Sequence, residues 1–362
     1  MRQVSSPIEQ SFSVYLDLAR FIAALLVVVS HFQQHGVLGA PFSTLSNYGR
    51  ESVMVFFVLS GFVIAYTTEH KNQTARAYVL ARCARIYSVA LPVLLLAFVV
   101  AAFAASLGVA SADAYPLHKP WLYIPLHLLF AGEMWNLAET PPWLLPYWSL
   151  GYEVWYYVLF GVLYYLRGGV RVLAAAAVLV LVGPKLWLLL PVWMSGVWLY
   201  HWQQTHAIER RVARIGWGLT LLLLAAFKAV GLDHALRMLG IALWPFPALH
   251  LGSADRYLAD YVVCALVLAN FACARFAGFE ALARLARPVR KLAAHTFTLY
   301  LSHYLVIYTW LAFYPHDTSS VVDIAALSML IALVTVVLGA LTEGRKDWFR
   351  ARLGLGLAAA KH

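Results

Sequence analysis

The residues most able to take part in a chemical reaction are ionisable side chains inside long apolar segments. Residues 15–32 read YLDLARFIAALLVVVSHF and contain Arg20 and His31, eleven positions apart. Eleven residues of α-helix turn through about 1100°, so the two side chains share one helix face, about 16 Å apart along the axis. An ionisable group in an apolar helix is costly and usually marks function. His31 is therefore a candidate general base, with Arg20 as a cation on the same face.

Both residues also have a purely structural interpretation. Arg20 could extend its side chain to the polar interface at the end of the segment, and His31 could be a hydrogen-bonded core histidine. Asp17 precedes Arg20 by one turn and is a candidate ion-pair partner. Two independent structural interpretations do not explain why Arg20 and His31 share one helix face, so the pattern favours a functional pair.

A carboxylate lies in a second apolar segment that is rich in aromatic residues. Residues 148–157 read WSLGYEVWYY and contain Glu153, which needs a partner because an unpaired buried carboxylate tends to be neutral. A His31–Glu153 pair would suit general base chemistry, since the carboxylate fixes the imidazole tautomer. The aromatic residues alone could simply form a belt at a membrane interface.

Three smaller motifs add candidate groups. Ser60 and Gly61 in an aromatic helix permit close backbone approach, and small-residue packing explains them adequately. Arg82 and Arg85 share a helix face and suit phosphate recognition, although topology-setting charge explains them equally. His303 lies in a late apolar segment and is either a second functional group or a core hydrogen-bonding residue.

The composition defines the elements that must hold these groups. The 362 residues are 62% hydrophobic and 12% charged, and the mean hydropathy is +0.72, whereas soluble domains are about 45–50% apolar and about 25% charged. These values exclude a soluble globular protein, a disordered chain and a coiled coil. Long unbroken apolar runs also differ from the alternating segments of a β-barrel. The sequence therefore predicts an all-α, polytopic transmembrane helical bundle.

About ten spans fit the apolar pattern, since each span needs about 20 residues. Segment 120–131 is apolar but short and predicts an interfacial helix, and segment 237–251 is broken by Pro245 and Pro247 and predicts a re-entrant or interfacial piece, or an eleventh span. The predicted spans are residues 14–32, 52–68, 86–107, 144–166, 172–189, 191–202, 213–232, 257–274, 296–314 and 321–342.

The distribution of positive charge predicts the orientation. Of the 27 Lys and Arg residues, 20 fall in the segments that are inner if the N-terminus is cytoplasmic, and five fall in the outer segments. This bias places both termini in the cytoplasm. The net charge of +10 is then cytoplasmic loop charge facing anionic lipid, with no need for nucleic acid. We expect a membrane domain over 1–345 and a short basic cytoplasmic tail over 346–362.

The remaining composition is uninformative about chemistry. Cys83, Cys264 and Cys273 lie in or beside apolar segments without CxxC spacing, which argues against a disulfide framework or a zinc site. We expect no metal. The first apolar run lacks a strong basic flank, so it is expected to be a retained first span and not a signal peptide.

Taken in order, these motifs resemble those of the acyltransferase type 3 family of integral-membrane acyltransferases. One departure is Tyr156-Tyr157, where Phe-Tyr is commoner; another is that some members carry a fused extracytoplasmic hydrolase-like domain, which this sequence lacks. The similar segments are Arg20-x10-His31 (Arg-x10-His), residues 56–64 FFVLSGFVI (FF-x-x-SGF), Arg82-x-x-Arg85 (Arg-x-x-Arg), residues 148–157 (WSL-x-x-E) and residues 299–303 LYLSH (YL-x-H).

The resemblance implies a multi-pass protein of the inner (cytoplasmic) membrane that transfers an acyl group, usually acetyl, from cytoplasmic acyl-CoA to a carbohydrate hydroxyl. Acetyl-CoA is then a donor substrate, and no bound cofactor is expected. Typical acceptors are O-antigen, exopolysaccharide or lipid-linked glycans. Segments 108–143 and 233–256 are the candidates for acceptor contacts.

The resemblance and the residues together suggest roles. Arg20, Arg82 and Arg85 are expected at the CoA moiety. His31 is expected to be the general base or a transient acyl carrier, with Glu153 orienting it. Pocket residues of lower rank are Asp17, Ser60, Tyr157 and His303, of which Ser60 and Tyr157 could donate to a developing oxyanion.

Three other functions compete with direct transfer. The chain could relay the acyl group across the membrane to a separate periplasmic transferase. A secondary transporter would also use intramembrane His, Glu and Arg, but no internal repeat is visible in the sequence. A non-catalytic scaffold would leave the cost of the buried charges without a role.

Overall fold

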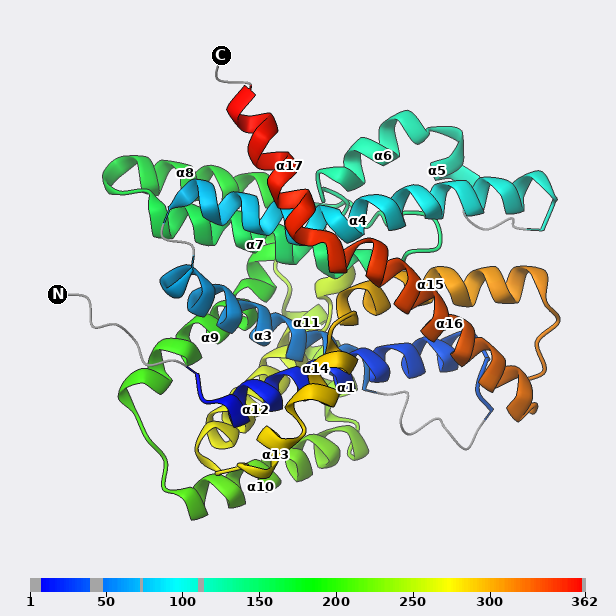
Figure 1. The fold of residues 1–362 in the computed structure, drawn as a ribbon. Helices are drawn as coiled ribbons and strands as arrows, with labels where there is room; N and C mark the ends of the chain where they lie inside the picture. Colours follow the sequence, from blue (N-terminus) through cyan, green and yellow to red (C-terminus); the bar gives the residue numbers. More distant parts are fainter. Residues whose placement is uncertain (1–7, 40–47, 72–73, 110–113, 360–362) are drawn as a thin grey trace.

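A computed structural model describes residues 8–39, 48–71, 74–109 and 114–359 (Figure 1). About 80% of the chain is helical, and the described part contains no strand, as the all-α prediction requires. Arg2 and Lys361, which entered the charge count, lie outside the described residues, as does part of the predicted segment 108–143.

Every predicted span falls on helical residues, although the fifth (172–189) straddles two helices. Long helices that correspond to the spans are α1 (Gln10–Gln34), α3 (Gly49–His70), α4 (Ala75–Ser106), α7 (Tyr147–Tyr165), α8 (Gly168–Val182), α9 (Pro184–Thr205), α10 (Arg210–Ala229), α12 (Tyr257–Phe276), α15 (Thr296–Phe313) and α16 (Val321–Leu341). Shorter elements are α5 (Ala114–His118), α6 (Pro120–Leu128), α11 (Leu232–Leu243), η2 (Gly252–Ala254), α13 (Ala281–Arg284), α14 (Ala286–Ala293), η3 (Glu343–Arg345) and α17 (Lys346–Ala359).

By length and composition, six helices of the described chain can cross a membrane, and a bent pair raises this to seven. Helices α7 and α15 are not among them, because their Tyr, Ser, Thr, Glu and His residues lower the hydropathy. The membrane-protein character is therefore clear. Those same polar residues belong to the motifs that carry the chemistry.

The boundary between the fifth and sixth predicted spans is wrong. The predicted boundary lies between 172–189 and 191–202, with the sixth span short enough to merge with its neighbours, but residues 184–205 form the single helix α9. The chain instead bends by 120° between α8 and α9. Gly183 there has φ +81°, which glycine adopts easily, and Pro184 begins α9, where its missing N–H costs nothing.

The two apolar segments that were too short or too broken to span also form helices. Segment 120–131 contains α6, as expected for a short interfacial helix. Segment 237–251 supplies the second half of α11, which ends at Leu243 before Pro245 and is followed by turns.

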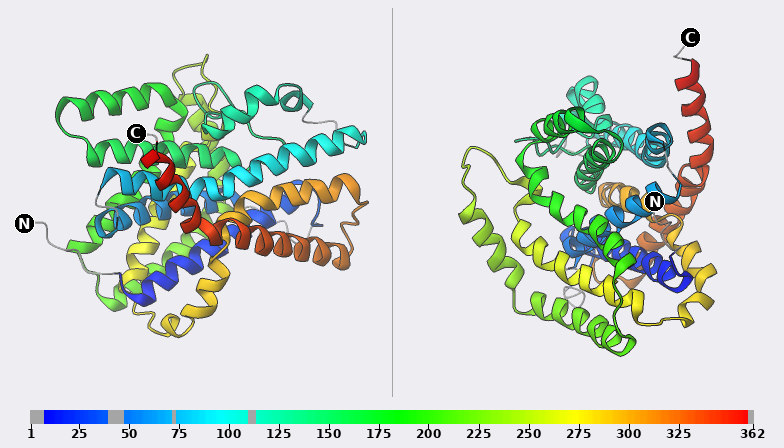
Figure 2. Two further views of the ribbon diagram at one scale, coloured as in Figure 1. Left: turned by 45° about the horizontal axis from the view of Figure 1, so that its top comes forward. Right: turned by 90° about the vertical axis from the view of Figure 1, so that its left-hand side faces the viewer.

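Helices α1 and α3 lie in the middle of the bundle. Helices α7 and α8 lie on one side of them, and α10 and α12 lie on the other (Figures 1 and 2). We call the two ends of the bundle the Arg20 end and the His31 end, after the residues on α1. Helix α3 also crosses α9 at very short range: a Cβ on Gly61 would lie 2.0 Å from the Trp193 carbonyl oxygen, and one on Gly196 would lie 2.0 Å from that of Val58. The close approach predicted for Ser60-Gly61 is thus confirmed.

The α3–α9 contact yields a stability prediction. Gly196→Ala forces the backbones apart and should cost about 1–3 kcal/mol of the free energy of unfolding, measured by thermal unfolding in detergent. Gly218→Ala on α10 is the matched control, because a Cβ there meets nothing within 4 Å and alanine favours the helix. Equal stability of the two variants would contradict the packing described.

Candidate active site

A cavity of about 270 Å³ opens where α1, α3, α4, α7, α14, α15 and the start of α17 converge. It contains many of the residues that the sequence singled out. Its polar lining consists of Asp17, Arg20, Ser60, Arg85, Ser149, Glu153, Tyr157, Arg290, Thr296, Tyr300, Glu343 and Lys346. We call this the basic cavity, since it gathers three arginines and a lysine around three carboxylates.

Glu153 lies in the basic cavity as the acceptor of two short hydrogen bonds. Ser60 Oγ and Tyr157 OH each donate to its Oε1 at 2.5 Å. Trp193 Nε1 donates to Ser60 Oγ at 3.1 Å and so orients the serine. The glutamate, predicted to need a partner, thus obtains two hydroxyl groups, one from α3 and one from its own helix.

The cations of the basic cavity come from four separate segments. Arg20 pairs with Asp17 at 3.6 Å, as predicted. Arg85 lines the cavity, whereas Arg82 is not among its lining residues and instead places its guanidinium 5.6 Å from the centre of the Tyr157 ring. Arg82 thus approaches the site through Tyr157.

Several lining residues were not identified from the sequence. Arg290 on α14 and Lys346 at the start of α17 had been assigned only to loop charge, because nothing local distinguishes a cation that faces a cavity from one that faces solvent. Ser149 and Tyr300 lie within the WSL and LYLSH segments, so their motifs were a usable signal.

His31 lies outside the basic cavity and against α15. Its Nδ1 is 2.8 Å from Nε2 of His303, the two rings stack at 5.0 Å, and the Tyr304 ring meets His31 edge-on at 4.9 Å. Both histidines are buried. The sequence brought His31 and His303 forward separately, and the structure joins them directly.

The expected contact between His31 and Glu153 does not occur among the described residues, which corrects that prediction. Glu153 is engaged by Ser60 and Tyr157, while His31 turns toward His303. The reason is the direction of the two helix faces: α7 presents Glu153 to α3, and α1 presents His31 to α15.

Tyr300 lines the basic cavity and also neighbours the histidine pair. Its hydroxyl lies 2.6 Å from Ser149 Oγ, and its ring is 5.3 Å from Phe56 and 6.4 Å from His303. Tyr300, Ser149 and Phe56 all line the cavity. Neither His31 nor His303 lines the cavity, and His303 neighbours the lining residue Tyr300.

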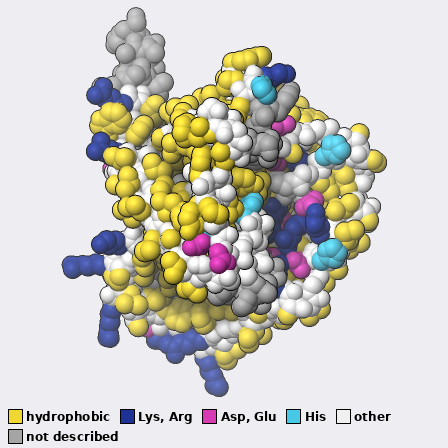
Figure 3. All heavy atoms as spheres, turned by 90° about the vertical axis from the view of Figure 1, so that its right-hand side faces the viewer, with side chains coloured by type: hydrophobic (Ala, Val, Ile, Leu, Met, Phe, Trp, Pro, Cys, Tyr) yellow, Lys and Arg dark blue, Asp and Glu magenta, His cyan; other side chains and the backbone are white. Residues whose placement is uncertain are grey.

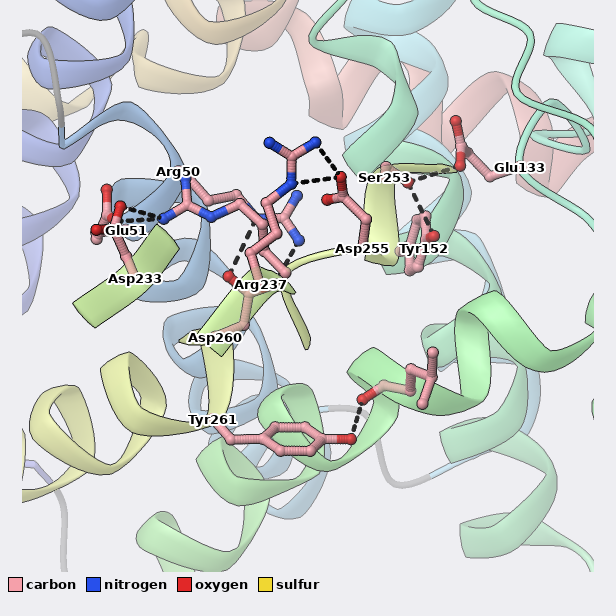
Figure 4. A network of polar contacts seen from close by, with 12 residues as sticks. Arg50, Glu51, Glu133, Tyr152, Asp233, Arg237, Ser253, Asp255, Asp260 and Tyr261 are labelled. Atoms are coloured by element: carbon pink, nitrogen blue, oxygen red, sulfur yellow. Dashed lines mark hydrogen bonds and ion pairs between the residues drawn. The ribbon is translucent and has the colours of Figure 1, made fainter. Parts of the chain in front are cut away.

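An ion-pair network occupies the His31 end, around the starts of α3 and α12 (Figure 4). Arg50 makes two hydrogen bonds to Asp260, of 3.1 and 2.5 Å, and covers the Trp148 ring at 4.7 Å. The other members are Lys228 and Arg256, each bonded to both Glu51 and Asp233, and Arg237, bonded to Asp255.

Charge balance characterises this network. Burial would raise the pKa of Asp233, but the hydrogen bond and charge of Lys228 and the charge of Arg256 hold it below its ordinary value. Figure 3 shows basic and acidic side chains gathered together on the face at this end, beside a hydrophobic area. The ion-paired cluster is therefore polar without a strong net charge.

The two segments proposed for acceptor contacts are joined to each other. Asn136 Nδ2 donates to the Ala248 carbonyl at 3.0 Å, and the His250 N–H donates to Asn136 Oδ1 at 3.1 Å. Ser253 Oγ donates to Glu133 Oε2 at 2.6 Å. Burial lowers the pKa of His127, on α6, to about 4, so that histidine adds no positive charge near neutral pH.

Metal and disulfide chemistry find no structural support in the described ranges. No group of three or more His, Cys, Asp or Glu residues there could hold a metal ion. Cys83, Cys264 and Cys273 are free thiols.

A family model described as an acyltransferase domain matches residues 13–342. No curated protein and no solved structure matches the chain.

The buried pair of Lys185 and Glu133, 3.3 Å apart, yields a stability prediction. Lys185→Met leaves the Glu133 carboxylate buried without its cation and should cost about 3–5 kcal/mol of the free energy of unfolding. Adding Glu133→Gln should restore most of that loss, because the amide oxygen still accepts from Ser253. Thermal unfolding in detergent measures both.

A surface pair provides the control. Arg210 and Glu280 are 2.8 Å apart but more than half exposed, with side-chain exposures of 54% and 68%. Arg210→Met should therefore cost less than about 1 kcal/mol. A double variant at 133 and 185 as unstable as Lys185→Met alone would contradict the buried-pair interpretation.

Proposed function

The chain belongs to the acyltransferase type 3 family, and we propose that it is a membrane O-acyltransferase that moves an acetyl group from acyl-CoA to a hydroxyl of a cell-envelope carbohydrate. The acceptor would be an exopolysaccharide, an O-antigen or a lipid-linked glycan. The observation that carries this proposal is the basic cavity, which places Arg20 and Arg85 beside the hydroxyl groups that surround Glu153.

The basic cavity suits the donor. Arg20, Arg85 and Arg290 can bind phosphate oxygens through paired N–H groups, and Lys346 adds a point charge. A cavity of about 270 Å³ would take the thioester arm of acyl-CoA, with the nucleotide phosphates held by these cations. Because Lys346 lines the cavity, the segment expected to be only a tail would contribute to donor binding.

His31 supplies the proton chemistry in this proposal. It accepts the proton of the acceptor hydroxyl while that oxygen bonds to the thioester carbonyl carbon. The carbon–sulfur bond then breaks, and CoA leaves as a thiolate that takes the proton back from His31. Ser60 and Tyr157 each have one hydroxyl proton, which the structure directs to Glu153, and in this scheme they turn it to the oxyanion as the charge develops. In a covalent variant, His31 itself carries the acyl group before the acceptor takes it.

Turnover in this scheme requires a local opening. His31 does not line the donor cavity, whereas Tyr300 does and is held by Ser149 at 2.6 Å. In this scheme the Tyr300–Ser149 hydrogen bond breaks so that the acyl carbon can reach His31. Once Tyr300 moves aside, the thioester and the imidazole share one space.

The proposed setting is the inner membrane, crossed about ten times with both termini cytoplasmic. The positive-charge bias supports this orientation, which turns the Arg20 end and the basic cavity toward cytoplasmic acyl-CoA. The His31 end, with its joined segments around Asn136 and Ser253, then faces the acceptor side.

Acyl relay to a separate periplasmic transferase is the second candidate. The separation of the basic cavity from the His31 end favours it, because donor and acceptor would approach from opposite ends. Purified protein in liposomes, given acetyl-CoA and glycan, distinguishes the two: acetylated glycan supports direct transfer, and CoA release without acetylated glycan supports relay.

Removing the proposed base gives the first functional prediction. His31→Ala should lower glycan acetylation by at least about 10²–10⁴-fold, measured by mass spectrometry of the product in liposomes. Acetyl-CoA binding should stay near the wild-type value, because His31 is not among the residues lining the basic cavity. Near-wild-type acetylation would rule out the assignment.

The second functional prediction concerns the affinity for acetyl-CoA. Arg85→Ala removes a charged hydrogen-bond donor from the cavity and should raise the Kd for acetyl-CoA about 10–100-fold, measured by calorimetry. Arg82→Ala should have a smaller effect, since Arg82 contacts the Tyr157 ring. Arg171→Ala on α8 is the control, because Arg171 is exposed and its loss should leave the Kd unchanged. An unchanged Kd for Arg85→Ala would show that this arginine only sets topology.

A further inference from the structure

His303 is joined to the proposed base by a hydrogen bond whose direction can be worked out. Each neutral imidazole has one N–H donor and one acceptor nitrogen, and the partners decide which is which. His303 Nδ1 lies 2.8 Å from the Leu299 carbonyl oxygen, one turn earlier on α15. A carbonyl oxygen can only accept, so Nδ1 of His303 carries the proton.

That assignment determines the rest of the pair. With its proton on Nδ1, neutral His303 has its lone pair on Nε2, the atom 2.8 Å from His31 Nδ1. Nδ1 of His31 is therefore the donor in this contact. The lone pair of neutral His31 must then lie on Nε2, the nitrogen directed away from His303.

We infer that His303 is a positioning residue that holds His31 in the tautomer with a free Nε2. This inference rests on the proposed function, in which Nε2 of His31 takes the acceptor proton or carries the acyl group. The Tyr304 ring, edge-on to His31 at 4.9 Å, restrains the plane of the imidazole. His303 thus takes the orienting role that the sequence suggested for Glu153.

The pair also has a consequence for the charged intermediate. When His31 accepts a proton on Nε2, its Nδ1–H becomes the donor of a charged imidazolium. The hydrogen bond to His303 then strengthens, since charge-assisted bonds are roughly twice as strong as neutral ones. His303 needs no change of protonation, because its own Nδ1–H stays on the Leu299 carbonyl.

Two substitutions of His303 separate positioning from packing. His303→Gln places an amide oxygen near the position of Nε2 and can still accept from His31. His303→Leu fills similar space and cannot accept. We expect His303→Leu to lower kcat for glycan acetylation about 10–100-fold, as for other partners that orient a functional histidine, and His303→Gln to recover most of that loss. The Kd for acetyl-CoA should not change.

His316 provides the matched control. It is a histidine with a side chain only 3% exposed, bonded to Trp310 and to the Val37 carbonyl, and it has no part in the mechanism. His316→Gln should leave kcat per folded molecule unchanged. A folded His303→Leu protein with wild-type kcat, or a Gln variant no better than Leu, would overturn the inference.

A spectroscopic measurement tests the tautomer without relying on turnover. In the ¹⁵N NMR spectrum of histidine-labelled protein in bilayers, His31 should show a protonated Nδ1 and an unprotonated Nε2. His303→Leu should shift this population toward the other tautomer. A wild-type His31 protonated on Nε2 alone would overturn the inference. If the wild type transfers no acetyl group, the proposed function fails, while the spectrum still decides the tautomer.

Discussion

A polar side chain buried among apolar helices must find its hydrogen-bond partner inside the protein, and the site depends on this constraint. Glu153 satisfies it with Ser60 and Tyr157, and His31 satisfies it with His303. Each solution ties one helix to another, so the same contacts position the chemical groups and fix the packing of α1, α3, α7 and α15. Chemistry and fold are therefore difficult to separate in this bundle.

The sequence predicted the helices and the contacts within one helix, but it did not predict the contacts between helices. Long apolar runs located the helices, because a helix and its length can be recognised from consecutive residues. Asp17 and Arg20 paired as expected, since residues one turn apart meet on any helix. The partner of His31 could not be predicted, because it depends on which faces of α1, α7 and α15 meet. The position of Arg290 and Lys346 at the cavity could not be predicted for the same reason. The apolar pattern placed the boundary between the fifth and sixth spans near residue 190, whereas the positive φ of Gly183 and the start of α9 at Pro184 place it at 183–184.

The two halves of the site differ in electrostatic character. The basic cavity concentrates cations contributed by helices distant in sequence, which suits a polyanionic ligand. The histidine pair lies among aromatic rings, and among the described residues neither histidine forms an ion pair with a carboxylate. The network around Arg50 and Asp260 is different again, since its four cations are balanced by four carboxylates. A single bundle thus keeps the cation-lined cavity, the histidine pair and the ion-pair network in separate places.

The glycine contact between α3 and α9 has a mechanical consequence. Backbones this close at Gly61 and Gly196 leave no room for a side chain between α3 and α9, and the Trp193–Ser60 hydrogen bond joins the same two helices. Helix α15 instead contacts α1 and α3 through aromatic rings, with Tyr304 against His31 and Tyr300 against Phe56. The candidate site residues are therefore held by two kinds of contact, backbone against backbone between α3 and α9, and ring against ring at α15.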